Sequence, residues 1–336
     1  MQAARSTQKY RITSVDATIR RLCACIAMCG LCLLATAEIG WAADGPTFLL
    51  RWGTRGAALG QFGAVYGIGI DPQGQIYVAD AGLNRIQVFS ADSLLLRTIG
   101  TVGSGPGQFR SVRDVAVDHS GNVYALDSES ATPDLGRIEV FDASGDFVRQ
   151  WPLAVSRLSH SIALSPDDSL VYATVGEYVL KYTTTGLPIA QWSYLGTNNG
   201  NFGNRGVAVG ASGAVYVASI NLGIVVKYSP NGDVLNVVDQ IDTPLGVALD
   251  SGERLYVSTG IGEMRCQMRD ASGLYLAGWG APGTENGQFT YPLDLAVAPN
   301  GDVFVIDEAR PWIQKFGFVA TAAVRGSWGE LKSRFR

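Results

Sequence analysis

The chain has 336 residues, with 26 Lys and Arg against 30 Asp and Glu, and its formal net charge is −4. Because 47% of the residues are hydrophobic and only 17% are charged, the composition excludes a disordered chain and allows one long β-domain or two ordinary domains. The 41 glycines, which follow no collagen-like period, indicate many tight turns, and the two histidines exclude a three-histidine metal site.

The first 42 residues have the order of a secretory signal. Basic residues precede an apolar run over 22–37, which ends in the small-x-small cleavage sequence ATA, and a cut after Ala42 is the alternative. The run is shorter than the ~20 residues that span a bilayer, which favours a signal peptide over an uncleaved membrane anchor. We therefore expect a signal peptide at 1–42, in helical form, and a periplasmic or extracellular location.

Removal of this segment changes the cysteine count and the charge. Four of the five cysteines leave with it, so that Cys266 alone remains and no intrachain disulfide can form. The rest of the chain holds 21 Lys and Arg against 28 Asp and Glu, a net charge of −7. It lacks the basic surface that nucleic acids require, so we expect no nucleic-acid partner, and contact with a membrane only through an uncleaved signal.

One pattern of strand, turn and strand recurs six times after the signal. The clear copies are IDPQGQIYVAD (70–80), VDHSGNVYALD (117–127), VGASGAVYVAS (209–219) and VAPNGDVFVID (297–307), and the looser ones are LSPDDSLVYAT (164–174) and LDSGERLYVST (249–259). The aromatic residues of successive copies are 47, 48, 44, 40 and 48 residues apart. Units of this length, each read as four short strands, predict an all-β, six-bladed β-propeller.

Glycine-bearing segments of constant length connect the units. Trp52 and Phe62 are ten residues apart, as are Ile99 and Phe109, Trp192 and Phe202, and Trp279 and Phe289. Such a segment suits a chain that travels from the outer rim of one blade to the axis of the next, because glycine bends without Cβ clashes.

The closure of the ring is ambiguous in the sequence. There are six inner-strand units but seven candidates for an outermost strand. We expect 48–53 to complete the sixth blade of a propeller over 43–317, which leaves 318–336 as an added edge strand and basic tail. In the alternative, residues 323–329 close the ring.

The segment 60–89, which contains GQF and IGIDPQGQIYVADAGLNRIQVF, resembles an NHL repeat. The resemblance extends over roughly 48–317; the first, second and sixth units carry most of the pattern, the fourth carries part, and the third and fifth depart from it. It implies a propeller but no single activity, because NHL propellers include an amidating lyase, sensor ectodomains and binders of RNA or protein. That lyase holds zinc with three histidines from three blades, and only His160 occupies a comparable position here.

Aligned units place polar side chains where the inner strands enter the channel. The entry position holds Tyr66, Arg113, His160, Arg205, Leu245 and Leu293, and the next position holds Gly67, Asp114, Ser161, Gly206, Gly246 and Asp294. The candidate ligand-binding residues are Tyr66, Arg113, Asp114, His160, Arg205 and Asp294. The hairpin over 128–136 is five residues longer than its counterpart in the first unit and should overhang this face.

The two arginines suit a carboxylate or another anion, Tyr66 would add an apolar wall with a hydroxyl, and His160 a donor tunable by pH. The alternative interpretation is that Arg113 and Arg205 pair with neighbouring loop carboxylates or line a wet channel.

No cofactor is expected. His119 lies in a turn on the opposite face from His160, about 20 Å away at ~3.3 Å per residue, so the two cannot share a zinc ion. Asp80, Asp127 and Asp307 end the second strands, where carboxylate oxygens could bind calcium. The resemblance implies instead that these residues hold the following loop by hydrogen bonds.

Two classes of function fit these observations. The first is an exported, non-catalytic scaffold that binds a protein, a peptide or an envelope polymer through its loop-rich face at the channel mouth. The second is a lyase or hydrolase that acts at the same mouth. No nucleophile–base pair and no paired catalytic carboxylates are readable from the spacing, which favours the binding scaffold.

Overall fold

The computed structural model of the protein describes residues 45–128, 136–194 and 203–318. The chain divides into two units, Met1–Ala42 and Ala43–Arg336, and all described residues belong to the second. The predicted signal peptide and nearly all of the predicted C-terminal edge strand and tail lie outside the described residues. Within the described ranges, no helix is long and apolar enough to cross a membrane.

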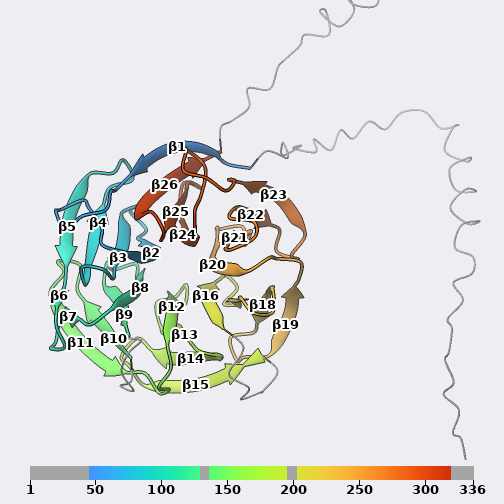
Figure 1. The fold of residues 1–336 in the computed structure, drawn as a ribbon. Coiled ribbons are helices and arrows are strands. Elements are labelled where there is room, and N and C mark those ends of the chain that lie inside the picture. The colour runs from blue at the N-terminus through green and yellow to red at the C-terminus, as the bar shows by residue number, and fades with distance from the viewer. Residues whose placement is uncertain (1–44, 129–135, 195–202, 319–336) are drawn as a thin grey trace, which may run out of the picture. The chain divides into compact units, whose positions relative to one another are not determined.

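Six four-stranded antiparallel sheets form a ring of blades, which confirms the predicted all-β propeller (Figure 1). Blade one consists of β2 (Val65–Ile70), β3 (Ile76–Asp80), β4 (Arg85–Phe89) and β5 (Leu95–Ile99), and blade two of β8 (Val112–Val117), β9 (Val123–Asp127), β10 (Arg137–Phe141) and β11 (Phe147–Pro152). Blade three consists of β12 (Ser159–Leu164), β13 (Leu170–Val175), β14 (Tyr178–Thr183) and β15 (Pro188–Ser193), and blade four of β16 (Asn204–Val209), β17 (Val215–Ser219), β18 (Ile224–Tyr228) and β19 (Val234–Val238).

Blade five consists of β20 (Pro244–Leu249), β21 (Leu255–Thr259), β22 (Cys266–Arg269) and β23 (Tyr275–Trp279), and blade six of β24 (Pro292–Val297), β25 (Val303–Asp307), β26 (Trp312–Gly317) and β1 (Thr47–Trp52). The first strand of each blade lies at the central channel in Figure 1, and the fourth lies at the rim.

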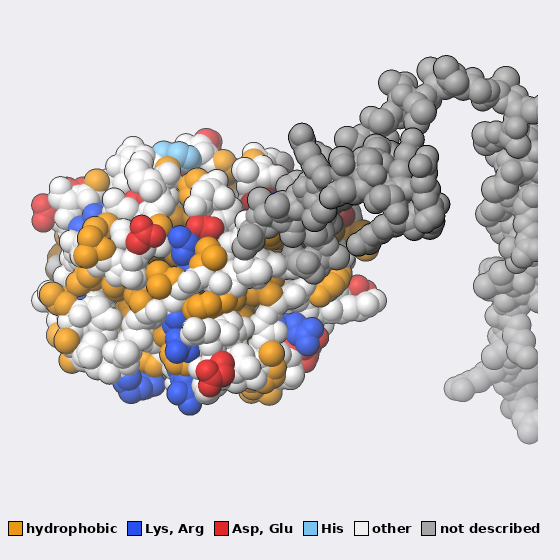
Figure 2. All heavy atoms as spheres, turned by 90° about the horizontal axis from the view of Figure 1, so that it is seen from above, with side chains coloured by type: hydrophobic (Ala, Val, Ile, Leu, Met, Phe, Trp, Pro, Cys, Tyr) orange, Lys and Arg blue, Asp and Glu red, His pale blue; other side chains and the backbone are white. Residues whose placement is uncertain are grey.

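The hydrophobic core consists of six clusters, one between each pair of adjacent blades. The aromatic residue of every repeat is at most 2% exposed; the six are Tyr77, Tyr124, Tyr172, Tyr216, Tyr256 and Phe304. The strands rich in β-branched and aromatic residues are thus the second strands, which are buried on both faces. Figure 2 shows the outside of the ring, where apolar side chains lie among polar and charged ones.

The N-terminal strand closes the ring. β1 pairs antiparallel with β26, from Thr47 opposite Gly317 to Trp52 opposite Ile313. The ring of Trp52 packs against Phe304 of the same blade and Phe89 of blade one, with centroids 6.0 and 6.1 Å apart. Residues 45–318 therefore contain six complete blades, with the closure by residues 48–53 that the sequence favours.

The linkers that enter blades one, two and six are held by hydrogen bonds from polar side chains of the third strands. Gln87 of β4 accepts a hydrogen bond from the Gly60 amide (2.9 Å) and donates one to the Gln61 carbonyl (2.7 Å), and Gln314 of β26 does the same for its own linker. Glu139 of β10 takes this position in blade two. The Glu139 carboxylate can accept a hydrogen bond from the linker amide, but it cannot donate one to the linker carbonyl. Arg137 donates that second hydrogen bond instead, to the Gln108 carbonyl at 2.5 Å.

Candidate functional site

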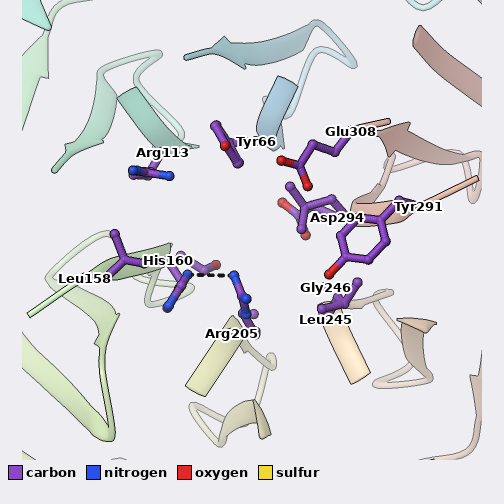
Figure 3. Close-up of a pocket in the computed structure, with 13 residues that line it drawn as sticks. Tyr66, Arg113, Leu158, His160, Arg205, Leu245, Gly246, Tyr291, Asp294 and Glu308 are labelled. Carbon is purple, nitrogen blue, oxygen red and sulfur yellow. Dashed lines mark hydrogen bonds between the residues drawn. The ribbon is translucent and has the colours of Figure 1, made fainter. Parts of the chain in front are cut away.

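A cavity of about 310 Å³ opens at the end of the channel where the inner strands begin. All six residues predicted for the entry position line it: Tyr66, Arg113, His160, Arg205, Leu245 and Leu293. Figure 3 shows several of these side chains around a common opening. Ser161, Asp294, Tyr291 and Glu308 add further polar groups to the wall.

A β-bulge occurs at the entry position of every inner strand. The pairing register shifts between Val65 and Gly67 in blade one and between Val112 and Asp114 in blade two, and corresponding shifts occur in the other four blades. A bulged residue leaves the regular alternation of a strand and can be aimed independently of its neighbours. The bulges therefore explain how one side chain from each blade reaches the channel mouth.

Arg113 and Arg205 form the cationic part of the wall. The Nε atom of Arg113 donates to the Ser128 carbonyl at 3.0 Å, and its guanidinium lies over the Tyr66 ring, 4.8 Å from the centroid. Arg205 donates from Nη1 to Nδ1 of His160 at 3.1 Å. Among the described residues, neither arginine forms an ion pair with a carboxylate. The predicted overhanging hairpin, which carries Glu129 and Asp134, lies outside the described residues over 129–135.

His160 is a neutral imidazole and not a donor that pH can tune near neutrality. Burial, with the charges of Arg205 and Arg113, lowers the pKa of His160 to about 3. Because an arginine only donates hydrogen bonds, Nδ1 accepts and the ring hydrogen lies on Nε2. The expectation of a pH-tunable donor is therefore wrong, since two neighbouring cations and desolvation oppose protonation.

Tyr291 and Glu308 line the cavity on the side of blade six and were not among the predicted site residues. The Glu308 amide donates to the Tyr291 carbonyl at 3.0 Å, which ties the two residues together. The sequence could have indicated Glu308. It follows the buried Asp307 and is charged, whereas the equivalent positions after Asp80 and Asp127 hold the uncharged Ala81 and Ser128. Tyr291 precedes a proline at the start of an inner strand and carried no comparable signal.

The side chains at the next position bridge neighbouring inner strands at the floor of the cavity. Asp114 accepts a hydrogen bond from the Ile162 amide of blade three (2.9 Å), and Asp294 accepts one from the Ile68 amide of blade one (3.2 Å). Burial raises the pKa of Asp114 to about 7, and burial with the charge of Asp114 raises the pKa of Asp294 well above its usual range.

Asp114 does not line the cavity, although it was predicted as a ligand-binding residue. Its side chain is 3% exposed and is used between the strands of blades two and three. Asp294 both accepts the hydrogen bond from the inner strand of blade one and lines the cavity. In blade two the bulge separates Arg113, which lines the opening, from Asp114, which is buried.

The three aspartates that end second strands accept hydrogen bonds mainly from the segment that precedes the inner strand of their blade. The expected hydrogen bonds to the loop that follows each aspartate are not their main contacts. Asp80 accepts hydrogen bonds from the amides of Gly63 and Ala64. Asp127 and Asp307 accept equivalent pairs from the entry segments of blades two and six. All three are fully buried. Among the described residues, no group of three or more His, Cys, Asp and Glu is arranged to hold a metal ion.

His119 lies at the opposite end of the channel, in a second, shallower cavity lined mostly by aliphatic side chains of the inner strands. Its Nδ1 atom is 2.9 Å from Asp168 Oδ2. His119 and His160 therefore line different mouths, as the turn positions in the sequence predict.

The comparisons with known proteins agree with the propeller fold. A family model described as a 6-bladed beta-propeller matches residues 62–184, which is less than half of the chain. No curated protein matches the sequence. A structural genomics protein of unknown function from Bacteroides thetaiotaomicron is similar in structure, with a TM-score of 0.64 and 16% identity over 82% of this chain and 72% of that chain.

Virginiamycin B lyase from Staphylococcus aureus is also similar, with a TM-score of 0.55 and 12% identity over 80% of this chain and 99% of that chain. A catalytically inactive variant of that lyase with quinupristin gives a TM-score of 0.55 and 14% identity over 76% and 95% of the two chains. At these identities the likeness shows the fold alone.

Proposed function

We propose that this protein is an exported, non-catalytic propeller of the NHL type whose channel mouth binds a carboxylate-bearing segment of a peptide, protein or envelope polymer. The observation that carries the proposal is the convergence of Arg113 and Arg205 on one cavity without a carboxylate partner among the described residues. Arginine side chains bind carboxylates through two parallel hydrogen bonds, so they suit this class of ligand better than lysines do.

The charge balance of the cavity supports an anionic ligand. Two guanidinium groups face the half-buried Glu308 carboxylate and Asp294, whose pKa is raised well above its usual range by burial and by the charge of Asp114. The Nε2–H group of neutral His160 adds a further donor. A volume of about 310 Å³ is at the lower end of small-molecule cavities and fits one or two residues of a peptide.

The state of His160 supports binding over catalysis. A general base is effective when its pKa is near the working pH, and a pKa of about 3 makes this imidazole a weak base. Its ring is also occupied at Nδ1 by Arg205. These features suit a group that orients a ligand and do not suit one that removes a proton.

The test uses N-acetyl-dialanine as a carboxylate probe and its C-terminal amide as the matched uncharged control, with calorimetric titration as the readout. We expect the acid to bind and the amide to bind at least about tenfold more weakly. Arg113→Ala and Arg205→Ala should each weaken binding of the acid by about ten- to a hundredfold. Arg51→Ala, which changes a half-buried arginine of the outer strand β1 that does not line the cavity, is the control variant and should leave binding unaltered.

Equal binding of the acid and the amide, or unchanged affinity in both cavity variants, would contradict the proposal. Melting temperatures of all variants are measured in parallel, so that a loss of folding is not mistaken for a loss of binding.

A lyase acting at the channel mouth is the second candidate. Its support is the similarity to solved structures of virginiamycin B lyase, one of them with quinupristin. The test is incubation of the protein with virginiamycin B and quinupristin, followed by mass spectrometry of the products. Turnover that disappears in His160→Ala would favour the lyase, and unchanged substrates would favour the binding protein.

A further inference from the structure

We propose that the channel mouth binds a zwitterion, with the carboxylate at Arg113 and Arg205 and an ammonium group at a second subsite made by Glu308, Tyr66 and Tyr291. This inference rests on the proposed function, because the carboxylate end is the same, and it adds the chemical class of the ligand. A free amino acid or a short peptide with both termini unblocked has this combination of charges.

The charges of the cavity wall are segregated by blade. The cationic residues and His160 come from β8, β12 and β16 in blades two to four, whereas Glu308 follows β25 in blade six. In Figure 3, Arg113, His160 and Arg205 lie along one side of the opening, and Glu308, Asp294 and Tyr291 lie along the other. A ligand with one charge can use one side only, and a dipolar ligand can use both.

The Glu308 carboxylate interacts with Tyr66 through a side-chain hydrogen bond and retains its capacity to bind a cationic group. Among the described residues it forms no ion pair with Lys or Arg. Arg310, two residues further along, instead lies over the Trp312 ring at 5.7 Å from its centroid. A carboxylate at the wall of a half-enclosed cavity is more effective with a cationic partner than one in bulk water.

Two tyrosines line the cavity together with this carboxylate. Tyr66 lies between Glu308 and Arg113; its pKa is raised, first by burial and then by the charge of Glu308, while Arg113 opposes the rise. The hydroxyl of Tyr291 points into the opening in Figure 3. Aromatic faces and phenolic oxygens beside a carboxylate are suitable neighbours for an ammonium group.

The subsite is tested with di-, tri- and tetra-alanine, each compared with its N-acetylated form, which keeps the carboxylate and removes the ammonium charge. Titration calorimetry at pH 7 gives the ratio of the two affinities for each length. Because the distance between the two charges grows with length, we expect one length to bind best, with a free amine that improves affinity by about 5- to 20-fold.

In Glu308→Gln this ratio should fall to about one. Glu285→Gln, which alters an exposed carboxylate in the linker before blade six that does not line the cavity, is the matched control and should keep the wild-type ratio. The comparison between free and acetylated peptides needs no variant, so it stands even if Glu308→Gln fails to fold.

The outcomes separate the two proposals. If acetylated and free peptides bind equally well, the ammonium subsite is wrong and the carboxylate site remains. If the acetylated form binds tighter, the conclusion is the same. If neither form binds at any length, both proposals fail. A preserved ratio in Glu308→Gln would also overturn the assignment of this residue.

Discussion

The Nη1 atom of Arg205 in blade four lies 3.1 Å from Nδ1 of His160 in blade three, so that one blade sets the tautomer of a side chain on the next. The two residues are 45 positions apart in the sequence. Their contact keeps the histidine neutral and turns its Nε2–H group into a fixed donor. This relationship determines how the channel mouth can interact with a ligand.

We predict that His160 does not titrate between pH 5 and 8. Its pKa is lowered to about 3, first by burial and then by Arg205 and Arg113, so the neutral form persists across this range. Histidine ring resonances, measured by NMR in a His119→Asn background that leaves a single histidine, check this. In Arg205→Ala the pKa should rise toward its ordinary value, because one of the opposing cations is gone. A midpoint near pH 6.5 in the unaltered site would contradict the assignment.

Glu139→Gln should reduce the stability that the protein loses between pH 4.5 and 8 by about 1–3 kcal/mol. Burial is the main cause that raises the pKa of Glu139 to about 7, from an ordinary value of 4.5. The protonated carboxyl therefore contributes stability that is fully present below about pH 4.5 and is lost as the pH rises through 7. Glutamine, which blades one and six use at this position, carries no such charge.

The measurement is thermal unfolding of both proteins between pH 4.5 and 8. The loss of Tm between the acidic and the basic end should be smaller in the variant than in the wild type. Part of the pH dependence should remain in the variant, because the pKa of Asp114 is also raised to about 7. An equal loss of Tm with rising pH in both proteins would contradict the account of this buried carboxylate.

Gly67→Ala should destabilise the propeller by about 2 kcal/mol or more. A Cβ at this position would meet the Asp114 side chain and would lie 2.7 Å from the Arg113 carbonyl oxygen. Gly252→Ala is the control, since its Cβ would meet only Asp250 Oδ1 at 3.4 Å in an ordinary backbone conformation. Chemical denaturation compares the two variants, and equal losses of stability would show that the close approach of the inner strands does not constrain Gly67.

Deletion of residues 1–53 should open blade six and lower the unfolding free energy by at least about 3–5 kcal/mol. The deletion removes β1 and the Trp52 ring, which packs against Phe89 and Phe304, and leaves the edge of β26 unpaired. A chain that begins at Gly45 keeps every strand of the propeller and serves as the control. Identical unfolding curves for the two truncated chains would contradict closure by β1.

The fold was predictable because the information for it is local and repeated. Six copies of a turn followed by a strand with a buried aromatic residue fix the number of blades, and Trp52 followed by Phe62 marks the passage from one blade to the next. Alignment of the copies also placed Arg113, His160 and Arg205 at one end of the channel, because equivalent positions of a ring share a face.

The chemistry of the cavity was decided by tertiary contacts. A bulge in each inner strand separates Arg113, which faces the opening, from Asp114, which is buried between blades; no local sequence pattern marked this break in the alternation. The ionisation states of His160 and Glu139 depend on desolvation and on charges that folding brings close. Glu308 lines the cavity because the closed ring places blade six around the same channel as blades two to four. Periodicity therefore determined the architecture, whereas packing between blades decided which charges lie together and which are neutral.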